Sequence, residues 1–195
     1  MSFDIAPATE DRFDDLRQLL APKIPGSAAC WCLSYRFSSG DSQMKTGHGR
    51  EKLLRALCAG PIPPGVLAYD GDTAIGWSSV SPRSSYHRLV HSRVIPVIDD
   101  QPVWSVICFV VRPGHRRKGV ASALLTGAVD FARAKGAAIL EGYPADNAGA
   151  RLSSTFAYTG TRSLFERAGF TKVSDTTSKT GGVPRVVMRR ALGGG

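Results

Sequence analysis

In the N-terminal third of the chain, apolar residues recur with two different spacings. In residues 9–20 and 50–59 they recur every three or four positions, which predicts two amphipathic helices. Residues 30–37 alternate apolar and polar side chains and are rich in aromatic rings, which predicts a strand. Residues 38–49 are polar and glycine-rich, which is typical of a loop.

The middle of the chain predicts a hairpin, a buried strand and a helix. Apolar residues 66–69 and 74–80 flank Asp70-Gly71, a pair that favours a tight hairpin turn. Residues 103–111 form a run that is apolar except for Ser105, as expected of a strand buried on both faces. Residues 119–135 carry apolar side chains on one face and end at Gly136, which predicts the best-defined helix of the chain.

The C-terminal part predicts a short helix, residues 161–168, and three strands. The strands are expected at residues 137–140, 170–173 and 183–188. Two long connections without a regular pattern remain, residues 82–101 and 142–160. Because no repeat or low-complexity linker divides the chain, we expect a single α/β domain over residues 1–195, with a frayed tail at 189–195.

Composition excludes several classes of protein. Hydrophobic residues make up 43% of the 195 residues and charged residues 21%, which excludes a disordered chain and a disulfide scaffold. No apolar run is long enough to span a membrane, and the N-terminus lacks the pattern of a signal peptide. We therefore expect a cytoplasmic protein with no membrane partner.

The cysteines do not predict a metal centre. The four cysteines are Cys30, Cys32, Cys58 and Cys108. Cys30 and Cys32 lack the spacing of a zinc knuckle, and no second cysteine or histidine pair lies nearby. We expect reduced cysteines and no bound metal; Cys30, Cys32 and Cys108 are interpreted as small core side chains.

Positive charge is concentrated at one place. The formal net charge is +9, and residues 112–119 hold four of the Lys and Arg residues without an acid. A cluster confined to one turn favours a small polyanionic ligand, whereas a basic tail or an even coat would favour nucleic acid. The chain also lacks a recognition helix rich in Arg, Asn or Gln. No nucleic acid partner is therefore expected.

The charged turn lies between the buried strand and the best-defined helix. The first amides of a helix point away from it and attract anions. Gly119 at the helix start leaves room for a phosphate to approach the backbone, and Ala121 is small for the same reason. The turn lacks the Gly-Lys-Ser/Thr ending of a P-loop and the Gly-x-Gly-x-x-Gly pattern of dinucleotide-binding folds.

The turn resembles the acyl-CoA-binding signature of the GNAT superfamily of N-acetyltransferases, Arg/Gln-x-x-Gly-x-Gly/Ala. Here the signature reads Arg116-Arg117-Lys118-Gly119-Val120-Ala121. A second family feature, Leu-Tyr-x-x-x-Gly-Phe, is matched by residues 164–170, with Phe165 at the tyrosine position. The resemblance is best over residues 66–175. It implies the α/β (α+β) GNAT fold, a mixed sheet of about six to seven strands flanked by helices and splayed between strands 4 and 5.

The same resemblance implies acetyl-CoA as co-substrate and direct transfer of its acetyl group to a primary amine. The amides of residues 116–121 would hold the pyrophosphate, and Phe109, Val110 and Val111 would pair with the pantetheine arm. A backbone N–H near Val110 would polarise the thioester carbonyl. The cofactor-binding residues implied are Phe109, Val110, Val111, Arg116, Arg117, Lys118, Gly119, Val120, Ala121 and Phe165.

Two proton transfers need side chains that the family pattern does not fix here. Phe165 cannot protonate the leaving thiolate, so we expect Tyr158, Tyr143 or solvent to do so. Glu141 lies where the fifth strand should splay and is the candidate base. The alternative interpretation is that Glu141 pairs with a surface arginine.

Candidate acceptor-binding residues are Trp31, Tyr35 and Arg83. Strand aromatics are also common core residues, and Arg83 also fits an ordinary polar connection. The acceptor itself is left open between a small-molecule amine and a protein amine, and the pattern allows a homodimer.

Phe165 keeps a second function open, an acyl-CoA-binding module without transferase activity. The net charge keeps a remote third one open, a nucleic-acid-binding protein.

Overall fold

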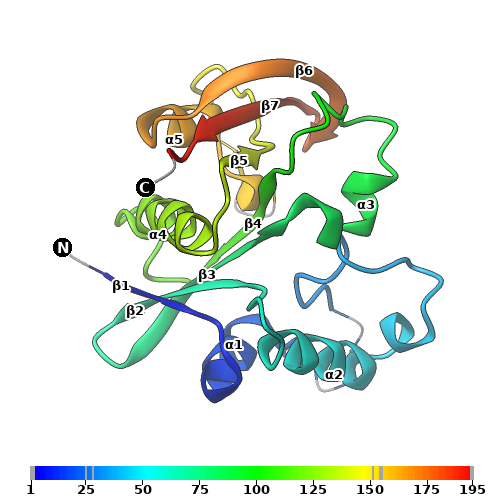
Figure 1. The fold of residues 1–195 in the computed structure, drawn as a ribbon. Helices are drawn as coiled ribbons and strands as arrows, with labels where there is room; N and C mark the ends of the chain where they lie inside the picture. Colours follow the sequence, from blue (N-terminus) through cyan, green and yellow to red (C-terminus); the bar gives the residue numbers. More distant parts are fainter. Residues whose placement is uncertain (1–2, 25, 28, 151, 154–155, 194–195) are drawn as a thin grey trace.

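The computed structural model describes residues 3–24, 26–27, 29–150, 152–153 and 156–193, and in them the chain folds around one seven-stranded sheet (Figure 1). The strand order is β1-β2-β3-β4-β5-β7-β6, and neighbouring strands are antiparallel except β4 and β5, which are parallel. The strands are β1 Asp4–Pro7, β2 Gly65–Asp70, β3 Thr73–Pro82, β4 Trp104–Val111, β5 Ile139–Gly142, β6 Thr171–Thr180 and β7 Val183–Ala191.

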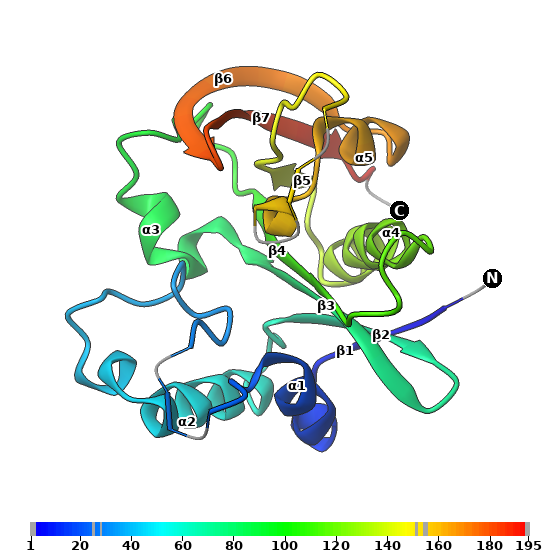
Figure 2. The same cartoon turned by 180° about the vertical axis from the view of Figure 1, so that it is seen from behind.

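Helices cover both faces of the sheet. The α-helices are α1 Phe13–Leu20, α2 Gly47–Cys58, α3 His87–Val90, α4 Val120–Ala134 and α5 Arg162–Arg167. Short 3-10 helices are η1 Glu10–Arg12, η2 Ser42–Lys45, η3 Arg83–Ser85 and η4 Ala157–Thr159. Figure 2, the view from behind, shows α1 and α2 on one side of β2 and β3 and α4 on the other.

Three apolar clusters follow from this arrangement. The largest joins α4 and α5 to one face of the sheet, through Leu124, Leu125 and Phe165 among others. A second joins α1 and α2 to the opposite face, around Trp77. The third lies beside the second and packs the segment after β3 on β4, β5 and β7. Burial of these faces supplies the main driving force for the fold.

The sheet opens between β4 and β5. Their pairing covers Trp104↔Leu140, Ser105↔Glu141 and Val106↔Gly142, whereas β4 continues to Val111. On the other side of β4, the pairing with β3 passes from Cys108 directly to Val106, so Ile107 is an extra residue. Such a bulge bends and twists a strand. The C-terminal half of β4 therefore has a partner strand on the β3 side alone among the described residues.

Most sequence-predicted elements are confirmed. The predicted hairpin is β2 and β3, the apolar run is β4, and the best-defined helix is α4. The two amphipathic helices are present as η1 with α1 and as α2. The strand predicted at residues 137–140 is shifted two residues, to β5.

The strand predicted at residues 30–37 is wrong. The segment forms successive turns: Leu33 donates its N–H to the carbonyl of Cys30, and Arg36 donates to that of Leu33. Trp31 and Cys32 both have positive φ, which a strand does not allow. The buried side chains gave the segment its apolar pattern, although Cys30, expected in the core, is exposed. The edge strand β1, short and without a strong pattern, was not predicted.

The frayed tail predicted at residues 189–195 is also wrong over its first part. β7 continues to Ala191, where it pairs with Ile139 of β5. The side chain of Leu192 is only 5% exposed, and its carbonyl accepts a hydrogen bond from Arg133 of α4. Packing on α4 therefore orders a segment whose own sequence carries little strand signal. Residues 194–195 lie outside the described residues.

None of the helices in the described part of the chain is long and apolar enough to cross a membrane.

Candidate active site

The loop between β4 and α4 is held by backbone geometry. Arg112 donates its N–H to the carbonyl of Ile75 on β3, and His115 donates to that of Arg112. Three residues of the loop have positive φ: Gly114 (88°), Arg117 (61°) and Gly119 (89°). Gly119 is the N-cap of α4, and no side chain caps the helix. These turns bring the chain back so that α4 starts beside the end of β4.

The first amides of α4 are free within the helix. The first helical hydrogen bond runs from Ala123 to Gly119, so the N–H groups of Val120, Ala121 and Ser122 have no acceptor in α4. The side chains of Arg116, Arg117 and Lys118 are exposed around these amides. A Cβ placed on Gly119 would meet no atom within 4 Å. The loop is therefore a positively charged cradle with room for an anion above it.

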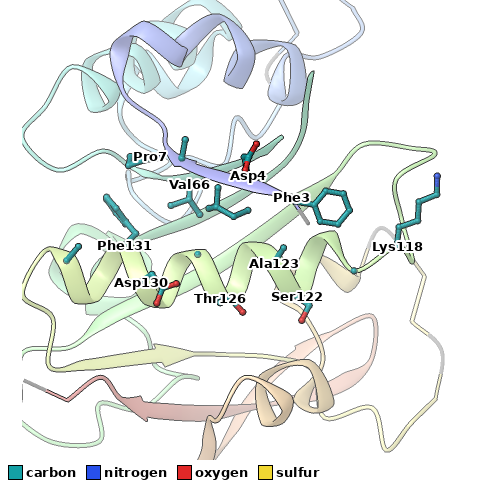
Figure 3. A pocket seen from close by; sticks show the side chains of 15 residues that line it. Phe3, Asp4, Pro7, Val66, Lys118, Ser122, Ala123, Thr126, Asp130 and Phe131 are labelled. Carbon is teal, nitrogen blue, oxygen red and sulfur yellow. The ribbon is translucent and has the colours of Figure 1, made fainter. Parts of the chain in front are cut away.

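A groove runs from this cradle along α4. It lies between the helix and β1, has a volume of about 770 Å³, and contains Lys118, Gly119 and Ser122 at its cradle end (Figure 3). Its floor is tight, because a Cβ on Gly127 would come within 2.3 Å of Ile5 on β1. We draw no function from the groove itself.

The open half of β4 turns two amides toward the gap. Arg112 bonds to β3, and backbone groups alternate sides along a strand. Val110 therefore faces β3, in agreement with its carbonyl lying 3.4 Å from a Cβ placed on Gly76. Phe109 and Val111 face the other side, where β5 has ended. The donor expected near Val110 is thus assigned to these neighbours.

Phe165 does not line the cradle. Its ring is fully buried, packed edge-on against Phe109 and Phe170, and a Cβ placed on Gly142 would come within 2.0 Å of it. In this structure the side chain fills the core beneath β5, and the contact with the cofactor expected of Phe165 stays a prediction. Val120, also buried, can offer only its backbone amide.

Glu141 belongs to a buried ion-pair network. Its side chain is 1% exposed, and its carboxylate receives Nε of Arg189 at 2.7 Å and lies 3.6 Å from Nε of Arg83. The hydroxyl of Tyr143 donates to it at 2.9 Å. Arg189 also pairs with Asp99, at 2.5 Å. Of the two interpretations of Glu141, this geometry favours the arginine pair.

The network ties the segment after β3 to the sheet. Arg83 begins that segment and Asp99 ends it, and both are held to β5 and β7 through Glu141 and Arg189. Arg83, predicted to bind the acceptor, contacts Glu141 and the Tyr143 hydroxyl in this network. Burial raises the pKa of Tyr143, and the negative charge of Glu141 raises it further.

Tyr158 and Tyr35 lie together beside the open half of β4. Burial raises the pKa of Tyr158, the Tyr35 hydroxyl adds to the rise, and the nearby Arg185 guanidinium opposes it. Tyr35 accepts a hydrogen bond from Nη1 of Arg185 at 2.8 Å. Both tyrosines are partly exposed. The third acceptor candidate, Trp31, is instead buried in the cluster of α1 and α2.

Arg185 is a site residue that sequence reasoning missed. The one available signal was a basic residue inside the apolar pattern of residues 183–188, where every neighbour from Val186 to Met188 is buried. Such a residue needs a partner in the core, and only the fold shows which groups surround it.

No group of three or more His, Cys, Asp or Glu side chains that could hold a metal occurs in the part of the chain that the structure describes. Cys32 and Cys108 approach each other, with their sulfur atoms 3.2 Å apart, and both are unbridged.

A mixed sheet splayed between parallel strands 4 and 5, with an anion cradle at the end of strand 4, defines an acyltransferase fold. Similar solved structures agree. One is the histone acetyltransferase HPA2 and related acetyltransferase from Corynebacterium glutamicum, 20% identical with a TM-score of 0.57, covering 98% of this chain and 97% of that one. Another is an N-acetyltransferase from Staphylococcus aureus, 13% identical with a TM-score of 0.56, covering 99% and 100%.

A third similar structure is yncA from Salmonella typhimurium with its cofactor acetyl-CoA, 14% identical with a TM-score of 0.54, covering 99% of this chain and 95% of that one. No curated protein matches the sequence. The model of the acetyltransferase (GNAT) family matches residues 34–170, well over half of the sequence. The chain therefore belongs to the GNAT acetyltransferase family.

Proposed function

We propose that the protein is an N-acetyltransferase that moves the acetyl group of acetyl-CoA directly to a primary amine. The observation that carries the proposal is the start of α4 beside the point where β4 leaves β5: the amides of Val120 to Ser122 have no acceptor within the helix, and cationic side chains of the loop surround them. A helix N-terminus with cations around it suits a multiply charged phosphate ligand.

The residues present fit acetyl-CoA. The cradle supplies several N–H donors and three cationic side chains to a pyrophosphate, and Gly119 leaves its approach open. The exposed backbone edge of β4 at Phe109 and Val111 can pair with an amide-bearing arm as an added strand would. Acetyl-CoA, when bound, supplies an acetyl group activated as a thioester and a thiolate leaving group.

The chain's own groups then act on charge and protons. The N–H of Phe109 or Val111 donates to the oxygen that becomes negative during transfer. Tyr158 is the side chain we assign to protonate the thiolate, because its short helix η4 lies beside β4 and a tyrosine hydroxyl carries its proton at neutral pH.

Glu141 is a poor base in this arrangement, because both of its oxygens already receive hydrogen bonds. We assign deprotonation of the amine to water. For an amine with an ordinary pKa this costs about 4–5 kcal/mol at pH 7. The rate constant kcat/KM should therefore rise with pH toward the pKa of the acceptor amine.

The test is acetyl-CoA binding by calorimetry, followed by thiol release with a panel of polyamines, aminoglycosides, amino acids and peptides. Binding with turnover on at least one amine supports the proposal, and absence of acetyl-CoA binding would overturn it. The proposal includes a cytoplasmic location, which rests on the residue pattern alone.

A second candidate is an acyl-CoA-binding module without transfer activity. The buried Phe165 favours it, since no hydroxyl is available at that position. Acetyl-CoA binding combined with no thiol release above the rate in water, across the whole panel, would select this function instead.

A further inference from the structure

Arg185 of β7 is a buried cation with an unused donor. Its side chain is 2% exposed. Nε donates to the carbonyl of Tyr143 at 2.8 Å, and Nη1 donates to the Tyr35 hydroxyl at 2.8 Å and reaches Ser178 at 3.5 Å. Nη2 is buried without any acceptor, and no carboxylate lies within 4.0 Å of the guanidinium among the residues that the structure describes.

The other buried arginines are compensated. In Arg36, Nη2 donates to the Pro64 carbonyl and to hydroxyl groups, Ser81 among them, and the guanidinium lies over the Tyr86 ring. Arg83 and Arg189 share the carboxylate of Glu141, although Nη2 of Arg83, like that of Arg185, is buried without an acceptor. Among these arginines Arg185 combines a bare Nη2 with the lack of a carboxylate among the described residues. A charge buried without a partner is strongly unfavourable, so the missing acceptor at Arg185 points to a ligand.

The position of Arg185 relates it to the gap in the sheet. Its backbone bridges to Ala145, three residues beyond the end of β5. Its guanidinium contacts Tyr35 and influences Tyr158, and Tyr158 is also influenced by Cys108 on the open half of β4. Arg185 is therefore held against the residues that follow β5, on the side of the molecule where β5 has left β4.

We propose that Arg185 binds a carboxylate carried by the acceptor, so that the substrate is a small amine that is also an acid. This inference rests on the proposed function and names its substrate class. A carboxylate supplies both what this guanidinium lacks, an opposite charge and an acceptor for Nη2. Because Nη2 is buried, only a small group can reach it, which favours a small molecule over a broad protein surface.

The test compares matched amines with and without the carboxylate: free amino acids, their amides, and a dipeptide with a free C-terminus. Thiol release gives kcat/KM for each, with the wild type and the variants Arg185→Met and Arg185→Lys. Arg190→Met is the matched control, because Arg190 lies on the same strand and bonds only to the carbonyl of Ala168 on α5's C-terminal side. Thermal stabilisation by each compound, in the presence of CoA, is measured in parallel.

We expect the wild type to prefer the carboxylate over its amide by at least about tenfold in kcat/KM, in line with a charge-assisted hydrogen bond. Arg185→Met should abolish the preference, Arg185→Lys should restore part of it, and Arg190→Met should keep it. A dipeptide that outperforms free amino acids would place the carboxylate at a peptide C-terminus.

Transfer to amines without any carboxylate preference, or a preference that survives in Arg185→Met, would overturn this inference and leave the proposed function standing. Absence of transfer would overturn the proposed function. In that case Arg185-dependent thermal stabilisation by the carboxylates would still support the binding site, and its absence would refute the site as well.

Discussion

Replacing Gly119 by glutamate tests the anion cradle directly. Gly119 has φ 89° and ψ −4°, and a Cβ there meets no atom within 4 Å. The substitution therefore destabilises the fold only through backbone strain, which costs about 1–2 kcal/mol for a non-glycine residue with left-handed geometry. For a domain of this length that lowers Tm by about 2–8 °C, so the variant should still fold.

The effect on CoA should be far larger than the effect on stability. Two unit negative charges about 4 Å apart near a protein surface repel by about 4 kcal/mol, which corresponds to a factor of about 10³ in Kd. The new carboxylate also competes for the amides at the start of α4, from Val120 to Ser122. We therefore expect CoA binding of Gly119→Glu to weaken by a factor of at least about 100, allowing for screening by salt.

Gly114→Glu is the matched control. Gly114 lies in the same loop, has φ 88°, and also has open space at its Cβ, so the strain and the change in net charge are the same. It precedes the free amides. Calorimetry with CoA and thermal unfolding are measured for both variants. If Gly119→Glu bound CoA within tenfold of Gly114→Glu, the assignment of the cradle to the cofactor phosphates would be refuted.

Three further predictions concern the buried groups. Glu141→Gln should lower the free energy of unfolding in urea by about 3–5 kcal/mol, because it leaves the buried Arg83 without a carboxylate and Arg189 with Asp99 alone. Glu166→Gln, at an exposed helix pair, should cost under about 0.5 kcal/mol, and equal costs would contradict the network. Tyr158→Phe should lower kcat by about 10²-fold or more, and an unchanged kcat would remove Tyr158 as the acid. Because the pKa of Tyr158 is raised from its ordinary value near 10, wild-type kcat should not decline through loss of this proton below pH 10. Phe165→Tyr should lower the free energy of unfolding by about 1–3 kcal/mol, because the new hydroxyl would be buried without a partner, and it should not raise kcat. A faster enzyme of unchanged stability would contradict the core role of Phe165.

The cofactor half of the molecule could be predicted because its signals are local. The strand, the basic turn and the helix that form the cradle are consecutive, and each has its own pattern: an apolar run to Val111, a glycine at 119, and an apolar face along α4. The hairpin of β2 and β3 is equally local, set by Asp70-Gly71. In such segments the residues that determine the structure are neighbours in the chain.

The errors lie where distant residues decide. Residues 30–37 alternate as a strand would, yet Trp31 and Leu33 are buried by α1, α2 and the sheet while the backbone makes turns. The place of Phe165 in its motif predicts a cofactor contact, and it gives no sign that the ring fills the core space left by Gly142, more than twenty residues earlier. Neither outcome could follow from local spacing, because both depend on which surfaces meet.

The residues on the acceptor side are the least predictable from the sequence, because they are the most widely separated along the chain. Tyr35, Cys108, Tyr158 and Arg185 come from four separate segments, and their meeting depends on the splay of β4 from β5 and on the turn at residues 30–37. Burying the Arg185 guanidinium costs desolvation free energy. A carboxylate partner would offset that cost, and the described residues supply none. The charge of the acceptor, rather than its size, is therefore the property that this side of the molecule is built to read.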